Sequence, residues 1–163
     1  MKQFLIPLVV CIMLTAGGTS YGQVLKAVNY DELKSVVEKN DDVLYVVNFW
    51  ATWCLPCVAE LPGFMEVNAQ FGSNPKFKMI LVSLDHVKGL ETTVKSFLTK
   101  KQITADVYLL NDNKRMNVWI PAIDPGWSGA IPATVFYKNG RKLYFIEDQI
   151  NKSTLEQLIN QYL

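Results

Sequence analysis

This sequence lacks an excess of charge of either sign: it has 16 lysines and arginines and 15 aspartates and glutamates, for a net charge of +1. A chain with so little excess charge has no broad basic field to attract nucleic acid or an anionic membrane surface. Internal repeats, low-complexity tracts and linkers rich in proline, glycine or serine are also missing after residue 23. Half of the 163 residues are hydrophobic, which is enough for one domain with its own core.

Long hydrophobic runs are missing too, except at the N-terminus. Lys2 gives a positive start, residues 4–16 are almost all apolar, and residues 17–22 are mostly small and polar. This pattern predicts a secretory signal peptide over residues 1–22, followed by one domain over residues 23–163. Because the apolar run is shorter than the roughly 20 residues that cross a bilayer, a retained anchor is the weaker interpretation. We therefore expect an exported, periplasmic protein without stable membrane insertion.

Cysteine is also scarce. The sequence has three cysteines, and one of them, Cys11, falls in the predicted signal peptide. The other two form the motif Cys54-Leu55-Pro56-Cys57. A disulfide across so short a loop restricts the unfolded chain little, so this pair is not a structural scaffold. We interpret it as a redox centre in a compartment where disulfides persist.

The hydrophobic pattern after residue 23 alternates between strands and helices. Residues 43–49 form a run of Val, Leu, Tyr and Phe interrupted only by Asn48, as expected of a central strand buried on both faces. Asn139-Gly140 between two apolar segments is a strong hairpin signal. The order predicts an α/β fold, with a mixed central β-sheet flanked by helices on both faces. Strands are predicted at 24–28, 43–49, 77–84, 105–110, 134–137 and 143–146, and helices at 31–39, 57–71 with a kink at Pro62, 90–101, 113–120 ending at Pro121, and 153–163.

The two cysteines lie where a predicted strand passes into a predicted helix. With this spacing Cys54 can sit at the exposed tip of the helix and Cys57 in its first turn. The helix N-terminus stabilises a thiolate, and lowering a thiol pKa from about 8.5 to about 7 is worth roughly 2 kcal/mol. We predict that Cys54 attacks a partner disulfide and that Cys57 resolves the mixed disulfide.

Two segments resemble thioredoxins. The first, Asn48-Phe-Trp-Ala-Thr-Trp-Cys-Leu-Pro-Cys57, is similar to their active-site segment, and Pro62 matches their helix-kinking proline. The second, residues 129–140, resembles the stretch in which thioredoxins carry a cis-proline facing the disulfide. The resemblance implies a thioredoxin fold, a cis Ile131–Pro132 bond, and a substrate backbone received by these two residues beside Cys54.

A carboxylate near the cysteines refines this resemblance. Cytoplasmic thioredoxins carry a buried aspartate where this chain has Asn48, which cannot accept a proton. Glu60 stands one helical turn after Cys57, and the pattern Trp-Cys-X-Pro-Cys-X-X-Glu-X-Pro is similar to exported thiol-disulfide oxidoreductases of the TlpA and ResA type. The resemblance implies that Glu60 handles the proton of the buried thiol, with a pKa raised by partial burial. The alternative is a solvated glutamate on the helix surface.

Other aromatic and titratable residues allow two interpretations. Trp50 and Trp53 either form an apolar collar at the cysteines, with Trp53 contacting substrate, or pack as ordinary aromatics. Trp127 either lines the substrate face or fills the core. His86, the single histidine, follows Asp85 at a strand end, and we interpret it as a loop residue. Copper-delivering members of the superfamily use three residues between the cysteines and a distant histidine, and this chain has neither.

Together these features predict a protein-disulfide reductase without a bound cofactor or metal. Its expected partners are disulfide-containing exported proteins, with cytochrome c maturation as one setting, and a membrane thiol-electron carrier as reductant. A monomer is expected. A disulfide oxidase or isomerase is the enzymatic alternative, and a thiol-dependent metal-binding module is the non-enzymatic one. A peroxidase is excluded because the Pro-X-X-X-Thr-X-X-Cys pattern of peroxiredoxins is missing.

Overall fold

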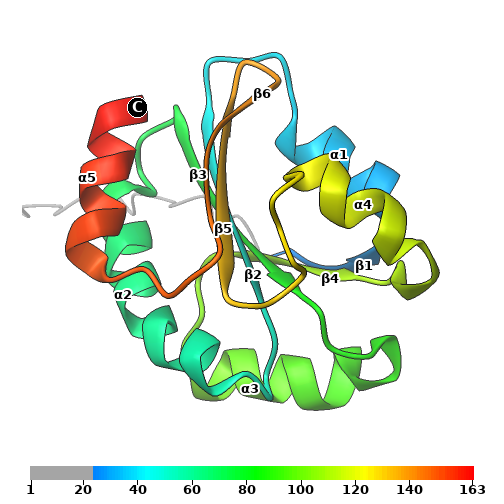
Figure 1. Ribbon diagram of the computed structural model, residues 1–163. Coiled ribbons are helices and arrows are strands. Elements are labelled where there is room, and N and C mark those ends of the chain that lie inside the picture. The colour runs from blue at the N-terminus through cyan, green and yellow to red at the C-terminus, as the bar shows by residue number, and fades with distance from the viewer. Residues whose placement is uncertain (1–23) are drawn as a thin grey trace, which may run out of the picture.

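The computed structural model describes residues 24–163, which fold around a six-stranded sheet. The predicted signal peptide and Cys11 lie outside the described residues. Four strands run parallel in the order β1-β4-β3-β2, and β5 and β6 follow as an antiparallel pair beside β2 (Figure 1). The predicted mixed sheet is confirmed. The strands are β1 (Leu25–Val28), β2 (Leu44–Trp50), β3 (Phe77–Ser83), β4 (Asp106–Leu110), β5 (Ala133–Lys138) and β6 (Arg141–Ile146).

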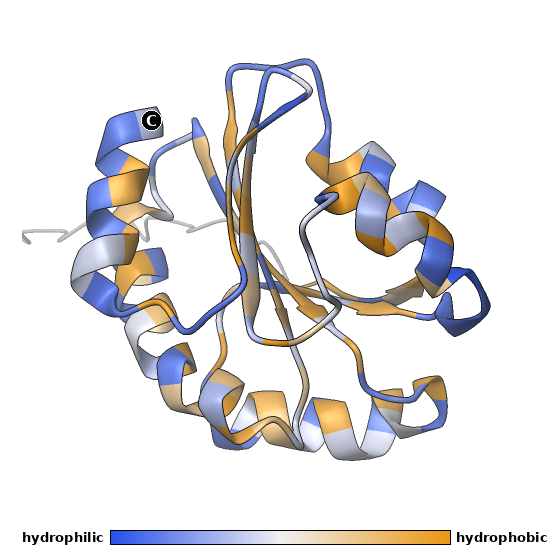
Figure 2. Ribbon diagram, viewed as in Figure 1, coloured by the Kyte–Doolittle hydropathy of each residue, from blue (hydrophilic) through white to orange (hydrophobic). Residues whose placement is uncertain are grey.

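Helices cover both faces of the sheet (Figure 1). On one face lie α2 (Leu55–Phe71), α3 (Lys95–Lys100) and α5 (Lys152–Tyr162). On the other lie α1 (Tyr30–Val37) and α4 (Met116–Ile123). In Figure 2 the strands are largely orange, whereas the helices alternate between orange and blue along the chain. The helices α1, α3 and α5 bury an apolar side against the sheet and leave a polar side in water, whereas α4 exposes Met116 and Val118.

The central strand β2 joins the two cores. All seven of its residues are buried. Because successive side chains of a strand point to opposite faces, Leu44 and Val46 enter the core beneath α2, and Tyr45 and Val47 enter the core beneath α1. The predicted strand buried on both faces is confirmed.

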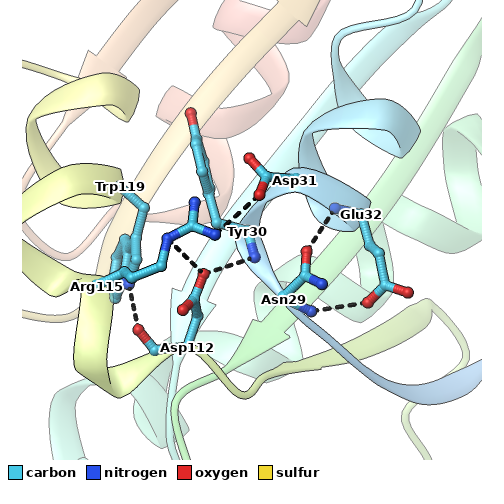
Figure 3. A network of polar contacts seen from close by, with 7 residues as sticks. All are labelled: Asn29, Tyr30, Asp31, Glu32, Asp112, Arg115 and Trp119. Atoms are coloured by element: carbon cyan, nitrogen blue, oxygen red, sulfur yellow. Dashed lines mark hydrogen bonds and ion pairs between the residues drawn. The ribbon is translucent and has the colours of Figure 1, made fainter.

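The start of α1 shows how local sequence begins a helix. The Asn29 side chain accepts a hydrogen bond from the Glu32 backbone at 2.9 Å, and the Glu32 carboxylate accepts one from the Asn29 backbone at 2.9 Å (Figure 3). This reciprocal capping box satisfies two backbone N–H groups at the helix start. Arg115, beside α4, donates to Asp31 at 2.9 Å and so links the two helices of this face.

The hairpin between β5 and β6 turns at the residues that the sequence indicates. Asn139 and Gly140 have φ angles of 53° and 69°. Glycine, and to a lesser degree asparagine, tolerates this left-handed conformation, which a tight hairpin turn requires. Both strands are longer than predicted and meet directly at this turn.

Two helices differ from their predictions. The helix predicted to end at Pro121 instead continues through it to Ile123, because Trp119 and Ile123 are buried on either side of the proline and packing outweighs the lost backbone bond. The helix predicted over residues 90–101 begins as a π-helical turn, Leu90–Val94, and only Lys95–Lys100 is α-helical. Within residues 24–163, no helix combines the length and apolarity that a bilayer crossing requires.

Candidate active site

The cysteines lie at the point where β2, in the middle of the sheet, leads into α2. Cys54 is the N-cap residue of α2, and its sulfur accepts a hydrogen bond from the Cys57 backbone N–H at 3.3 Å. Leu55 and Pro56 occupy the first helical positions, where a proline loses no helical hydrogen bond. The sulfur of Cys54 therefore sits at the positive end of a 17-residue helix, where a backbone N–H that has no partner within the helix donates to it.

Cys54 and Cys57 are joined by a disulfide, with their Cα atoms 5.3 Å apart. Cys57 is fully buried, whereas Cys54 is 6% exposed. Cys54 is thus the more accessible cysteine, but it does not stand at an exposed tip as predicted. Its flanking residues Trp53 and Leu55 are the exposed ones, and its sulfur is partly covered by the loop that carries Ile131.

That loop supplies the backbone opposite the disulfide. The Ile131–Pro132 peptide bond is cis, as the resemblance to thioredoxins implies. The Ile131 carbonyl oxygen lies 3.7 Å from the Cys54 sulfur, and Pro132 is buried directly before β5. The structure therefore brings together two segments 77 residues apart in the chain. Their roles toward a substrate remain predictions.

Glu60 lies inside the protein, one helical turn beyond Cys57. Its side chain is only 8% exposed, so the solvated glutamate considered as an alternative is wrong. Its two carboxylate oxygens accept hydrogen bonds from Asn48 Nδ2 at 2.8 Å and from the Ile150 backbone N–H at 3.0 Å. Burial raises the pKa of Glu60 to about 7, although both hydrogen bonds act to lower it, and the nearby Asp148 adds a smaller upward shift. This carboxyl group can hold or release a proton near neutral pH.

Asn48 connects Glu60 to the strand that follows Pro132. Its side-chain amide donates to Glu60 and also to Thr134 Oγ1 at 3.1 Å. Asn48 is fully buried, and its Oδ1 atom has no hydrogen-bond partner among the described residues. The position therefore provides a donor to the carboxylate and no proton acceptor of its own.

The tryptophans near the site have different roles from one another. Trp53 is 67% exposed beside Cys54. Trp50 is fully buried and packs on Phe97 with ring centroids 5.2 Å apart, so it belongs to the core and not to an apolar collar. Trp127 is buried as well and packs at a tilt against Phe49, with ring centroids 4.8 Å apart. Of the three, only Trp53 offers a surface to a substrate.

Comparison with known proteins adds the family. The AhpC/TSA family pattern matches residues 26–146, which include both cysteines, Glu60 and the Ile131–Pro132 bond. The chain belongs to the AhpC/TSA family. The family match begins within β1 and ends with the last residue of β6. The connector to α5 lies immediately beyond it.

One relative of this AhpC/TSA chain is named as a thiol-disulfide oxidoreductase. The chain is 28% identical over 116 residues to the thiol-disulfide oxidoreductase ResA of Oceanobacillus iheyensis. The match covers 71% of this chain and 55% of that protein, so the chain spans about half the length of this curated relative.

Solved structures establish the fold of this AhpC/TSA chain. A thiol:disulfide interchange protein of the thioredoxin family from Chlorobium tepidum TLS gives a TM-score of 0.63 at 22% identity, over 78% of this chain and 83% of that one. A secreted Mycobacterium tuberculosis disulfide oxidoreductase homologous to E. coli DsbE gives 0.52 at 21% identity, over 76% and 82%. The predicted thioredoxin fold is confirmed.

One buried carboxylate at this site, Asp85, was not predicted from the sequence. Asp85 is buried at the end of β3, where its side chain accepts hydrogen bonds from the Thr52 backbone at 3.0 Å, the Thr52 hydroxyl at 2.6 Å and the Ser83 hydroxyl at 2.8 Å. It therefore fixes the turn that leads from β2 to Cys54. Its place just after a predicted strand could have located Asp85 near Cys54, because adjacent parallel strands end at the same edge of a sheet.

His86 lies beside a surface hollow next to that turn. The hollow has a volume of about 420 Å³ and is lined by Thr52, Trp53, Asp85 and His86, among others. The His86 ring accepts a hydrogen bond from the Lys88 backbone at 3.2 Å, as expected of a residue that begins a short helical turn. Its interpretation as a loop residue is confirmed. Within residues 24–163 no three histidine, cysteine, aspartate or glutamate side chains gather as metal ligands.

Proposed function

We propose that this protein is a thiol-disulfide oxidoreductase that reduces disulfides of polypeptides outside the cytoplasm. One observation carries the proposal: the Cys54–Cys57 disulfide caps the N-terminus of α2 and faces the cis Ile131–Pro132 peptide. The name of the ResA relative supports the same activity. A binding surface alone would need neither a redox-active pair nor a helix N-terminus directed at one of its sulfurs.

In the reduced protein Cys54 is the nucleophile. Its thiolate attacks one sulfur of the substrate disulfide, a bond forms between Cys54 and that sulfur, and the other substrate sulfur leaves as a thiolate. The backbone N–H groups at the start of α2 stabilise the thiolate of Cys54 before the attack. Ile131 and Pro132 hold the substrate backbone beside it.

Cys57 then resolves the mixed disulfide. Its thiol loses its proton to Glu60, and the resulting thiolate attacks the Cys54 sulfur and releases the second substrate thiol. The substrate gains two electrons, and the protein is left with the Cys54–Cys57 disulfide. A carboxylate with a pKa of about 7 suits this step, because it can accept a proton at neutral pH and return it afterwards.

The proposed location rests on the N-terminal sequence pattern, with its positive start, apolar run and small residues through residue 22. In this setting a membrane thiol-electron carrier re-reduces the Cys54–Cys57 disulfide. Disulfide-containing exported proteins are the substrates, and apocytochromes c are one class to test. We propose that the protein acts as a monomer without a bound cofactor or metal.

The deciding experiment is the equilibrium reduction potential of the Cys54–Cys57 disulfide in dithiothreitol buffers, with Cys54→Ser as the control. A potential near or below about −230 mV supports a reductase. A potential near about −120 mV makes the protein an oxidase. If no two-electron titration occurs, and the purified protein carries stoichiometric copper or zinc, the metal-binding alternative replaces the proposal.

A further inference from the structure

The connector between β6 and α5 contacts the loop that precedes Pro132. The Glu147 carboxylate accepts hydrogen bonds from the Ser128 backbone at 3.1 Å and the Ala130 backbone at 3.2 Å, and also from the Ser128 hydroxyl. Between these two residues Gly129 has a φ of 92°, a conformation that favours glycine. One carboxylate thus holds a tight turn that ends at Ala130, immediately before the cis Ile131–Pro132 bond.

The same connector also holds the start of α2. The Gln149 side-chain amide donates to the Pro56 carbonyl at 2.8 Å. The next residue, Ile150, donates its backbone N–H to Glu60 at 3.0 Å. Residues 147–150 therefore connect the loop that precedes Pro132 with the start of α2, which carries the disulfide.

The loop is fixed from its inner side too. The Trp127 indole donates to the Ala130 carbonyl at 2.8 Å. Glu147 holds the backbone N–H of Ala130, so both polar backbone groups of this residue are occupied. The following carbonyl is that of Ile131, which lies 3.7 Å from the Cys54 sulfur. Any shift of the Ser128–Ala130 turn would therefore move the backbone next to the reacting sulfur.

Glu147 is suited to this task by its charge. The hydrogen bond from the Ser128 side chain, followed by that from the Ser128 backbone, lowers the pKa of Glu147. The carboxylate stays ionised at neutral pH, and hydrogen bonds to an ionised acceptor are stronger than those to a neutral one.

We propose that Glu147 is a positioning residue for polypeptide substrates. It holds the Ser128–Ala130 turn so that the Ile131 backbone is presented to the chain that carries the target disulfide. This inference rests on the proposed function, in which Ile131 and Pro132 receive the substrate backbone. Glu147 itself touches neither the substrate nor the cysteines.

The test compares a substrate that needs the loop with one that does not. Insulin carries its disulfides on a peptide backbone, whereas dithiodipyridine is a small disulfide without one. The rate of reduction of each substrate is measured for wild-type protein and for Glu147→Ala, Glu147→Gln and Ser128→Ala. Asp31→Ala is the matched control, because Asp31 is also a surface carboxylate that links two segments far apart in sequence, through Arg115.

Glu147→Ala should lower kcat/KM for insulin about tenfold, mainly through KM, and change the dithiodipyridine rate less than about twofold. The reduction potential of the Cys54–Cys57 disulfide should stay the same. Glu147→Gln and Ser128→Ala should give intermediate losses of about threefold, because each keeps part of the hydrogen bonding. Asp31→Ala should match wild type on both substrates.

Two outcomes would overturn the inference while leaving the proposed function intact: wild-type insulin reduction in all three variants at the site, or equal losses on both substrates. If Glu147→Ala does not fold, Ser128→Ala and Glu147→Gln decide the question, again by comparing the loss of rate on insulin with the loss on dithiodipyridine. If wild-type protein reduces neither disulfide, the proposed function fails and the inference fails with it.

Discussion

Asn48 donates its side-chain amide to the Glu60 carboxylate at 2.8 Å, across the interface between the central strand and α2. Together with the Ile150 backbone N–H, this donor satisfies both carboxylate oxygens. The two hydrogen bonds favour the ionised form, and burial opposes it more strongly, so that the pKa of Glu60 is raised to about 7. Both protonation states are therefore populated near neutral pH.

The first prediction concerns the pH dependence of disulfide reduction. In wild type the step that resolves the mixed disulfide should speed up as pH rises through about 7, because ionised Glu60 is the form that accepts the Cys57 proton. Glu60→Gln should slow this step by about 10²-fold or more and remove its inflection near pH 7. Single-turnover kinetics with insulin measure both effects.

Glu66→Gln is the control for this profile. Glu66 lies on the same helix but faces solvent, where it accepts a hydrogen bond from Lys152 at 2.6 Å. The variant should keep the wild-type pH profile. An unchanged profile in Glu60→Gln would instead show that another group takes the proton.

The second prediction concerns stability and pH. The pKa of Glu60 is raised in the folded protein, so the unfolded chain loses this proton first as pH increases from about 4.5. The free energy of unfolding should therefore fall between about pH 4.5 and 7 by about 3 kcal/mol and then level off. Glu60→Gln should remove this decline and should be more stable than wild type at pH 8. Urea denaturation at several pH values measures the difference, and parallel curves for the two proteins would contradict the prediction.

The third prediction concerns Asp85, which fixes the turn ahead of Cys54. Asp85→Asn replaces one acceptor oxygen with a donor, so the hydrogen bonds from Thr52 and Ser83 cannot all be kept. We expect a loss of about 2 kcal/mol in the free energy of unfolding and slower reduction of both insulin and dithiodipyridine.

Asp106→Asn is the matched control for Asp85. Asp106 also accepts a backbone hydrogen bond, from Val24 at 3.0 Å, but it does so on β4, which is separated from β2 by β3. This variant should lose some stability and keep both reduction rates. Equal rate losses in the two variants would mean that Asp85 acts only through overall stability.

The fourth prediction separates stability from activity. Asn29→Ala removes the cap of α1, so the free energy of unfolding should drop by about 1 kcal/mol. The reduction potential and the rates should not change, because α1 packs on the face of the sheet opposite α2. Asn68→Ala, which removes only a surface hydrogen bond to Thr104, should cost less than about 0.5 kcal/mol. A change of potential in Asn29→Ala would contradict this separation.

Patterns within short stretches of sequence were enough to predict most elements. The run from 43 to 49 indicated the central strand, and Asn139-Gly140 indicated the hairpin. The helix through Pro121 was not predictable, because its two neighbouring buried side chains outweigh the local preference of proline. The different surroundings of Trp50 and Trp53 also depend on packing, since their sequence context is nearly the same.

For the site itself, the sequence determined the chemistry and the tertiary structure determined the surroundings. The spacing of Cys54 and Cys57 is local, and a helix that begins between them follows from residues close in the chain. The contacts of Glu147 with Ser128, and of Asp85 with Thr52, join residues 19 and 33 positions apart. Such contacts exist only once the strands have paired in a particular order, and the periodicity of a single segment carries no information about which distant backbone groups will face it.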